Sequence, residues 1–318
     1  MKRTLAVIVA FTAAQAFAAD YPTRPIRIVS PFPPGGSVDL VSRLVGNDLN
    51  KPLGQQVVID NRGGASGMIG TALVKNATPD GYTLLVNTLP FVTNQFAYSK
   101  VPYDPIADFA HISVLCSVAS VLVAHPSMPA NSMKELIALA KSKPGSITYG
   151  TAGAATNPHI AGELLNHLGK IKLQPVHYKG GGPATVAALS GEVQLYFVNA
   201  IPEAVPHLKA GKLKALGITA TTRNSAAPDI PTMAEAGLPG YEFTTWQIFA
   251  APKGTPAAVI KKLNESVRAV LKTPEAQKRW QARGLDVIAN TPAEATAYMN
   301  SESKKWRAVF KEQGIKAE

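Results

Sequence analysis

The chain has 318 residues, which is enough for about two domains of ordinary size. Hydrophobic residues make up 46% of it and charged residues 17%, so we expect a sizeable buried core and exclude a disordered or coiled-coil protein. The formal net charge of +11 favours small anionic partners over nucleic acid, because the lysines and arginines are scattered and not clustered with aromatic residues.

The first residues have the pattern of a secretory signal peptide. Lys2 and Arg3 precede an apolar run over residues 5–14, and Ala16-Phe17-Ala18 is a small-x-small cleavage site. The run is well short of the roughly 20 residues that span a membrane. We therefore expect residues 1–18 to be removed and the mature protein to be soluble in a bacterial periplasm. Cys116 is the only cysteine, so we expect a buried thiol and no intramolecular disulfide.

Strand and helix patterns alternate along the rest of the chain. This alternation predicts an α/β fold built on mainly parallel sheets. The predicted strands cover residues 26–30, 57–59, 82–86, 112–115, 121–124, 147–149, 176–179, 193–198, 213–219 and 243–250, and the predicted helices begin near residues 37, 68, 133, 160, 184, 202 and 256.

The layout of strands and helices repeats once, which predicts two lobes joined by two crossings. We expect residues 19–122 and 246–318 to form the first lobe and residues 123–245 to form the second. No repeat is visible at the level of the sequence itself.

Four glycine-rich connections follow predicted strands, at residues 32–37, 61–67, 150–156 and 179–183. The carboxyl ends of strands in open α/β sheets face the crevice in which ligands bind. The first connection, Pro31-Phe32-Pro33-Pro34-Gly35-Gly36-Ser37, is stiffened by prolines, and its glycines allow a ligand to approach the backbone. Ser37 is placed to cap the following helix, whose N-terminus favours an anion. A plain strand-to-helix turn is the alternative for this segment taken alone.

Signatures of catalysis, of a nucleotide cofactor and of metal binding are missing. The chain has no G-x-G-x-x-G, G-x-x-x-x-G-K-[ST], H-E-x-x-H or G-x-S-x-G motif, and its histidines lack metal-like spacing. We therefore expect no catalytic residue, no cofactor and no metal. Arg62 has two interpretations, a clamp on a ligand carboxylate or an ion pair that holds its own loop. Asp39 is expected to stabilise the helix dipole or to contact the ligand.

Several segments in order resemble the Bug family, the periplasmic solute-binding proteins of tripartite tricarboxylate transporters. The resemblance runs from about Tyr21 to the C-terminus. It rests on residues 31–37 with Asp39 and Arg43, Asn61-Arg62-x-Gly64-Ala65-x-Gly67, Tyr178-Lys179-Gly180 with Pro183-Ala184, Asp229-Ile230-Pro231-Thr232 with Glu235 and Gly237, and Ala251-Pro252-x-Gly254-Thr255-Pro256.

The resemblance implies a two-lobed periplasmic-binding-protein fold that closes over a small carboxylate and has no catalytic activity. It implies ligand contacts largely through backbone groups and bridging waters. The residues implied in the first lobe are Phe32, Gly35, Gly36, Ser37 and Ala65, with Thr88 added by its strand-end position; those in the second lobe are Thr151, Thr156 and His159, with Gly181 and Asn199 added in the same way.

One departure from the family concerns the type of carboxylate. At the end of the strand predicted over residues 193–198, family members often have an acidic residue before the asparagine, whereas this chain has Phe197-Val198-Asn199. An aspartate there can receive an ammonium group, so its absence favours plain carboxylates over amino acids.

The function predicted from the sequence is capture of a small organic carboxylate by a monomer and its delivery to the membrane subunits of the transporter. The alternatives are a secreted α/β enzyme acting on a similar anion and a ligand-dependent receptor for a membrane sensor. The sequence leaves the identity of the ligand open, because backbone and water contacts carry little side-chain information.

Overall fold

The computed structural model describes residues 21–199, 201–224 and 227–313. The predicted signal peptide over residues 1–18 lies outside this range. Within it, no helix has the length and apolar character needed to cross a membrane.

The first lobe is built on β1 (Ile26–Ser30), which pairs in parallel with β2 (Val57–Asn61) and β3 (Thr83–Asn87). β3 pairs antiparallel with β9 (Thr244–Pro252), and β9 pairs antiparallel with β4 (Phe109–Ala124). The short strand β10 (Leu285–Val287) adds to β4 from the other side. The three parallel strands all end at the same edge of this sheet.

The second lobe is built on β5 (Thr148–Thr151), which pairs in parallel with β6 (Gln174–His177) and β7 (Leu195–Asn199). β8 (Lys214–Ile218) and β7 both pair antiparallel with the end of β4. The strands that precede the glycine-rich connections are therefore parallel, while the strands that join the lobes are antiparallel, so the sheet is more mixed than the sequence predicted.

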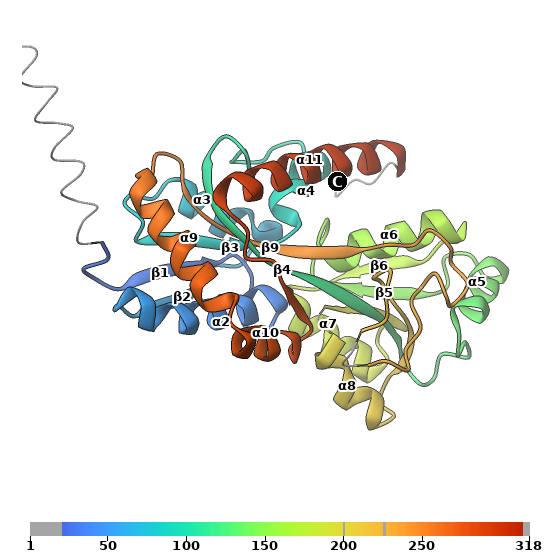
Figure 1. Cartoon of the computed structure of the whole chain (residues 1–318). Helices are drawn as coiled ribbons and strands as arrows, with labels where there is room; N and C mark the ends of the chain where they lie inside the picture. Colours follow the sequence, from blue (N-terminus) through green and yellow to red (C-terminus); the bar gives the residue numbers. More distant parts are fainter. Residues whose placement is uncertain (1–20, 200, 225–226, 314–318) are drawn as a thin grey trace, which may run out of the picture.

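β4 connects the two sheets. It pairs with β9 from Phe109 to Ala119 and with β7 and β8 from Ser120 to Ala124. Figure 1 shows β4 and β9 running side by side through the middle of the molecule, with one lobe on either side of them. The fold is the two-lobed α/β architecture that the sequence predicted; the residue bounds of the lobes stay a prediction.

Helices cover both sheets because each presents an apolar face to its sheet. Val41, Val45 and Leu49 of α2 are almost fully buried against the first sheet, and the helix ends at Gly54 in the left-handed conformation (φ +64°). The helices are α2 (Ser37–Leu53), α3 (Met68–Lys75), α4 (Pro90–Ala97), α5 (Met133–Ser142), α6 (Asn157–Gly169), α7 (Gly181–Ser190), α8 (Ile201–Lys209), α9 (Ala257–Leu271), α10 (Pro274–Gln281) and α11 (Pro292–Gln313), with a short 3-10 helix at Ala65–Gly67.

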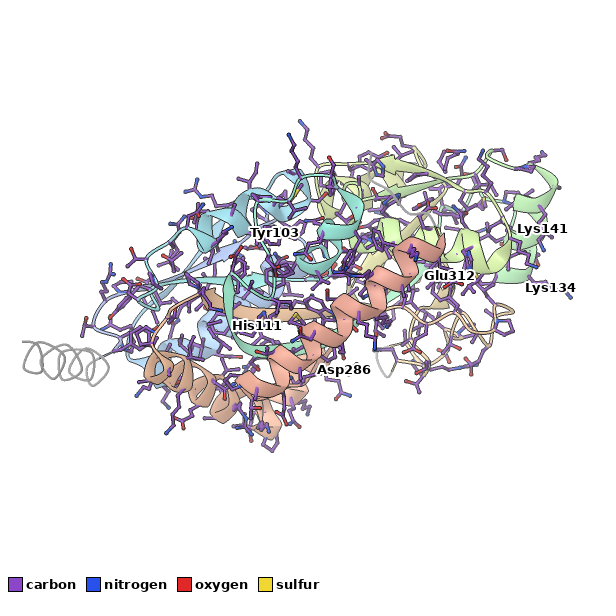
Figure 2. All side chains as sticks on the ribbon, turned by 90° about the horizontal axis from the view of Figure 1, so that it is seen from above. Tyr103, His111, Lys134, Lys141, Asp286 and Glu312 are labelled. Atoms are coloured by element: carbon purple, nitrogen blue, oxygen red, sulfur yellow. The ribbon has the colours of Figure 1, made fainter. Side chains whose placement is uncertain are left out.

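Several elements differ from the sequence prediction. The strands expected at 112–115 and 121–124 are one continuous strand, β4, and neither the helix α4 nor the short strand β10 was predicted. The tail after the helix start predicted near residue 256 holds three helices, α9, α10 and α11. Phe91 of α4 is completely buried and stacks on Tyr103 with ring centroids 5.8 Å apart. Tyr103 and His111 lie in this same aromatic cluster of the first lobe (Figure 2). Tertiary packing of a short apolar segment therefore defines α4.

A buried carboxylate attaches α11 to the crossing strand β9. Glu302 of α11 is 7% exposed, and its Oε2 accepts hydrogen bonds from the indole nitrogens of Trp246 in β9 (2.7 Å) and of Trp306 in α11 (2.8 Å). Trp246 is buried, and Cys116 is a free buried thiol, as expected from the sequence, whose Sγ donates to Gln247.

We expect Glu302→Ala to lower the free energy of unfolding by about 2–5 kcal/mol, because two buried indole N–H groups lose their acceptor. Glu302→Gln keeps an acceptor oxygen and is expected to cost clearly less. Urea denaturation followed by tryptophan fluorescence measures both values. Equal losses in the two variants would contradict this role of the carboxylate.

Candidate functional site

A cavity lies between the lobes. Its walls come from the loop at residues 31–37 and the end of β3 in the first lobe, and from the ends of β5 and β7 and the helices that follow them in the second. The lining residues are Phe32, Pro33, Gly35, Gly36, Ser37, Val38, Thr88, Pro90, Ala152, Thr156, Asn157, Pro158, Gly181, Thr185, Tyr196, Val198, Asn199 and Glu203.

Four helices begin at this cavity, and a fifth adds a first-turn residue. The first residues of α2, α4, α6 and α7 belong to its lining, and so does Glu203 in the first turn of α8. The first N–H groups of a helix have no partner inside it, and the helix dipole places partial positive charge there. No described residue of the lining is a lysine or arginine. Attraction for an anion at this part of the wall therefore comes from backbone N–H groups, hydroxyls and the side-chain amides of Asn157 and Asn199.

Asp39 holds the loop 31–37 in place from behind. Its carboxylate accepts hydrogen bonds from the Gly35 amide (3.1 Å) and from the Asn61 side chain (2.9 Å), and it forms an ion pair with Arg43 (3.0 Å). The Asn61 amide also donates to the carbonyl of Phe32 (3.1 Å). Gly35 has φ +86°, a conformation that favours glycine. Asp39 is thus a support for the loop and is absent from the cavity lining.

The charge of Asp39 is stabilised by these contacts. Burial by itself raises the pKa of the carboxyl group, but hydrogen bonds from Arg43, Gly35 and Asn61 outweigh burial and hold the pKa below its usual value. The carboxylate is therefore ionised at neutral pH and keeps all three donors engaged.

The corresponding loop in the second lobe, residues 152–156, is also held from behind. The Thr156 hydroxyl donates to the Gly153 carbonyl (2.6 Å), and the Ala155 amide donates to Nδ1 of His159 (2.9 Å). The Thr151 hydroxyl lies 2.6 Å from Nδ1 of His177. Burial, followed by repulsion from His177, lowers the pKa of His159 to about 4, so this histidine is a neutral acceptor at physiological pH.

The two lobes touch around the cavity. The Ser66 hydroxyl donates to the Ala154 carbonyl (2.6 Å), and the Tyr98 hydroxyl donates to the same oxygen (3.2 Å). The Asn157 amide of α6 donates to the Thr88 hydroxyl (3.3 Å). The lobes are therefore closed on one another in this structure.

Eight of the residues predicted from the sequence line the cavity, and three do not. Phe32, Gly35, Gly36, Ser37, Thr88, Thr156, Gly181 and Asn199 belong to the lining. Thr151 and His159 lie behind the loop 152–156, and Ala65 lies in the connection that reaches the second lobe through Ser66. Contact of any of the eleven with a ligand stays a prediction.

The structure supports the second interpretation of Arg62, an ion pair that holds its own loop. Its Nε lies 3.0 Å from Asp60, which also pairs with Arg27, and Arg62 is absent from the cavity lining. Among the described residues, no group of histidine, cysteine and acidic side chains has the arrangement of a metal site.

Two lining residues with unpaired acceptors were missed by the sequence analysis. Asn157 is 3% exposed, and its side-chain Oδ1 has no hydrogen-bond partner in the described structure. Glu203 brings a carboxylate to the cavity, and burial raises its pKa to about 7, while Arg283 offsets part of that rise. Both residues lie in the first turn of a helix, where asparagine and glutamate are ordinary, so the sequence carries no distinct signal for them.

The fold and site are those of a periplasmic solute-binding protein. A family model described as the tripartite tricarboxylate transporter family receptor matches residues 41–315. The chain belongs to this receptor family, which includes the Bug proteins. Its members bind solutes and are not enzymes, and they support transport.

Relatives in sequence and in structure agree with this assignment. The chain is 34% identical to the protein BugT of Bordetella pertussis, over 99% of each chain. A solved protein of R. palustris with adipate superposes with a TM-score of 0.89 at 33% identity, covering 93% of this chain and 99% of that one. MatC from Rhodopseudomonas palustris, with bound malate, superposes with a TM-score of 0.85 at 32% identity, covering 91% and 99%.

We expect Asp39→Asn to lower the free energy of unfolding by about 1–3 kcal/mol at pH 7, because hydrogen bonds to a charged group are lost. The folded-state pKa of Asp39 lies below that of the unfolded chain. The contribution is therefore present above the unfolded pKa of about 4 and disappears as the pH falls through the folded value. Urea denaturation between pH 7 and pH 3 checks this, with Asp229→Asn, at an exposed aspartate, as control. A difference between Asp39→Asn and wild type that is independent of pH would contradict the assignment.

Proposed function

We propose that the cavity captures a small organic carboxylate by closure of the two lobes, and that the loaded protein delivers it to the membrane subunits of a tripartite tricarboxylate transporter. The observation that carries the proposal is that four helices begin at the cavity and a fifth, α8, adds a first-turn residue, while its described lining holds no lysine or arginine. Such a wall suits a carboxylate, because the helix dipoles favour negative charge and each carboxylate oxygen accepts several hydrogen bonds from first-turn N–H groups that have no other partner.

Closure follows from the placement of donors on both walls. A ligand held by loop 31–37 and by the start of α6 contacts both lobes only when they are together, so it selects the closed state. The predicted lobes, residues 19–122 with 246–318 and residues 123–245, are the bodies that move in this proposal. The crossing strands β4 and β9 are the hinge, and the cross-lobe bonds of Ser66 and Asn157 contribute to the closed state.

The proposed ligand contacts are the eight predicted residues that line the cavity, together with Asn157. The unpaired atom of the buried Asn157 amide is its Oδ1, an acceptor, so it suits a bridging water or a donor group of the ligand and not the carboxylate itself. Thr151, His159 and Ala65 support these contacts from behind. The adipate and malate bound by two relatives make a carboxylate the first ligand to test.

The proposal also covers where the protein is located and its monomeric state. The pattern of residues 1–18 supports export to the periplasm, where a monomer meets the periplasmic face of its membrane partners. The membership of the receptor family supports this location.

A thermal-shift screen of mono-, di- and tricarboxylates, amino acids and aromatic acids tests the capture of an anion, because a ligand that binds only the folded state raises the melting temperature. We expect at least one carboxylate to raise it, and Gly36→Val to weaken that ligand at least tenfold. Gly36 has extended backbone angles (φ −97°), and a Cβ there meets no atom within 4 Å, so valine is tolerated by the fold and narrows the cavity.

Gly182→Val is the matched control, because Gly182 also has free space around it and is absent from the cavity lining. We expect this variant to bind as wild type does. A screen in which no carboxylate shifts the melting temperature, or a ligand that Gly36→Val leaves unaffected, would contradict the proposed site.

Delivery is tested by capture from membranes. We expect the protein, loaded with the carboxylate found in the screen and immobilised, to retain transporter membrane subunits from detergent-solubilised membranes of its source bacterium. The ligand-free protein is expected to retain less. Retention of a sensor kinase in their place would favour the receptor alternative and contradict delivery.

A further inference from the structure

We propose that Glu203 determines the class of ligand: a small carboxylate whose other polar group is a hydrogen-bond donor, an ammonium or hydroxyl, and not a second ionised carboxylate. This inference rests on the proposed function, since it concerns the same cavity. It goes further by assigning opposite chemistry to two parts of the cavity wall, one that donates to an anion and one that accepts from a donor.

Among the described residues that line the cavity, Glu203 alone carries a charge. It lies in the first turn of α8, beside Tyr196, Val198 and Asn199 of β7, which also line the cavity. Within the described residues its carboxylate has no hydrogen bond and no ion pair, and the side chain is solvent-accessible. The carboxylate is therefore free to accept a hydrogen bond from a ligand.

None of the described groups that face Glu203 forms an ion pair or a hydrogen bond with its carboxylate. Arg283 belongs to the turn before β10, and that turn packs on α8, where Gly284 is close to Pro202. Arg283 attracts Glu203 but forms no ion pair with it. Tyr196 of β7 is a neutral phenol, because burial raises its pKa. His207, one turn further along α8, and Lys209, in its last turn, are the other titratable groups of that helix besides Glu203, and the facing segment of β4, residues 120–124, carries none.

A second carboxylate placed beside Glu203 brings two like charges together at a partly desolvated position, so one of them must take up a proton before both fit. An ammonium or hydroxyl group donates to Glu203 without this requirement, and an ammonium adds charge attraction. In this proposal Glu203 takes the place of the acid absent at Val198, so the proposed ligand class differs from the plain carboxylates that Phe197-Val198-Asn199 favoured in the sequence.

The two ligand classes respond to pH in opposite directions. Partial desolvation raises the pKa of Glu203 to about 7, although its side chain stays solvent-accessible, so part of its charge is lost as the pH falls from 8 to 6. An ammonium-bearing ligand loses an attractive partner over this range and binds more weakly at pH 6. A dicarboxylate loses a repulsive neighbour and binds more tightly there. A hydroxyl-bearing ligand changes least.

Calorimetric titration with matched ligands tests the inference. The probes are succinate, glutarate and adipate, and the analogues in which an ammonium or a hydroxyl replaces one carboxylate of each. We expect an analogue to bind wild type at least tenfold more tightly than its parent dicarboxylate at pH 8. Glu203→Gln is expected to weaken an ammonium analogue at least tenfold, to leave a hydroxyl analogue within about threefold, and to strengthen the parent dicarboxylate.

Glu312→Gln is the control, since Glu312 is an exposed glutamate of α11 outside the cavity (Figure 2). This variant is expected to bind every probe as wild type does. Dicarboxylates that bind more tightly than their analogues at pH 8, with no effect of Glu203→Gln, would overturn the inference and leave capture of a carboxylate standing. Absence of binding by all probes and by all carboxylates of the thermal-shift screen would overturn both proposals.

Discussion

Parallel strands in one sheet end at the same edge, and the site depends on this constraint. β1 and β3 of the first lobe and β5, β6 and β7 of the second each deliver their chain to the cleft, and the helix after each strand must begin there. Each helix brings unpaired N–H groups to the edge of its sheet. The binding surface is therefore a product of topology first and of particular side chains second.

Residues behind the cavity hold the loops that form its walls in fixed positions. Asp39 in the first lobe and His159 in the second each accept a backbone N–H from the adjoining loop, one as a carboxylate and the other as a neutral ring. Polar groups held by such bonds are already oriented before a ligand arrives, so less ordering accompanies binding. The two lobes thus reach the same result with different chemistry, which agrees with the absence of a repeat in the sequence.

The sequence predicted what is local in this fold and missed what depends on distant contacts. The strands, the glycine-rich connections and the loop 31–37 are local patterns, and the family resemblance placed them in a two-lobed fold. Ala65 was expected at the site because the family resemblance implied it, but β2 is the outermost strand of its sheet, and the loop that follows β2 contacts the second lobe through Ser66. Glu203 was missed because its position depends on β7 lying between β4 and β5, an order that no local pattern encodes.

The division between a backbone-made anion wall and one side-chain acceptor has a consequence for how such receptors diversify. In the proposed site, substitutions in the first turn of α8 change which polar group the ligand must carry at the end away from loop 31–37. That loop and its support by Asp39 stay intact. Single exchanges at this helix turn of the proposed site would therefore alter which solute is bound. For the same reason this chain is a suitable starting scaffold for a biosensor, in which the recognised metabolite is altered at one helix turn and the closing motion is kept as the signal.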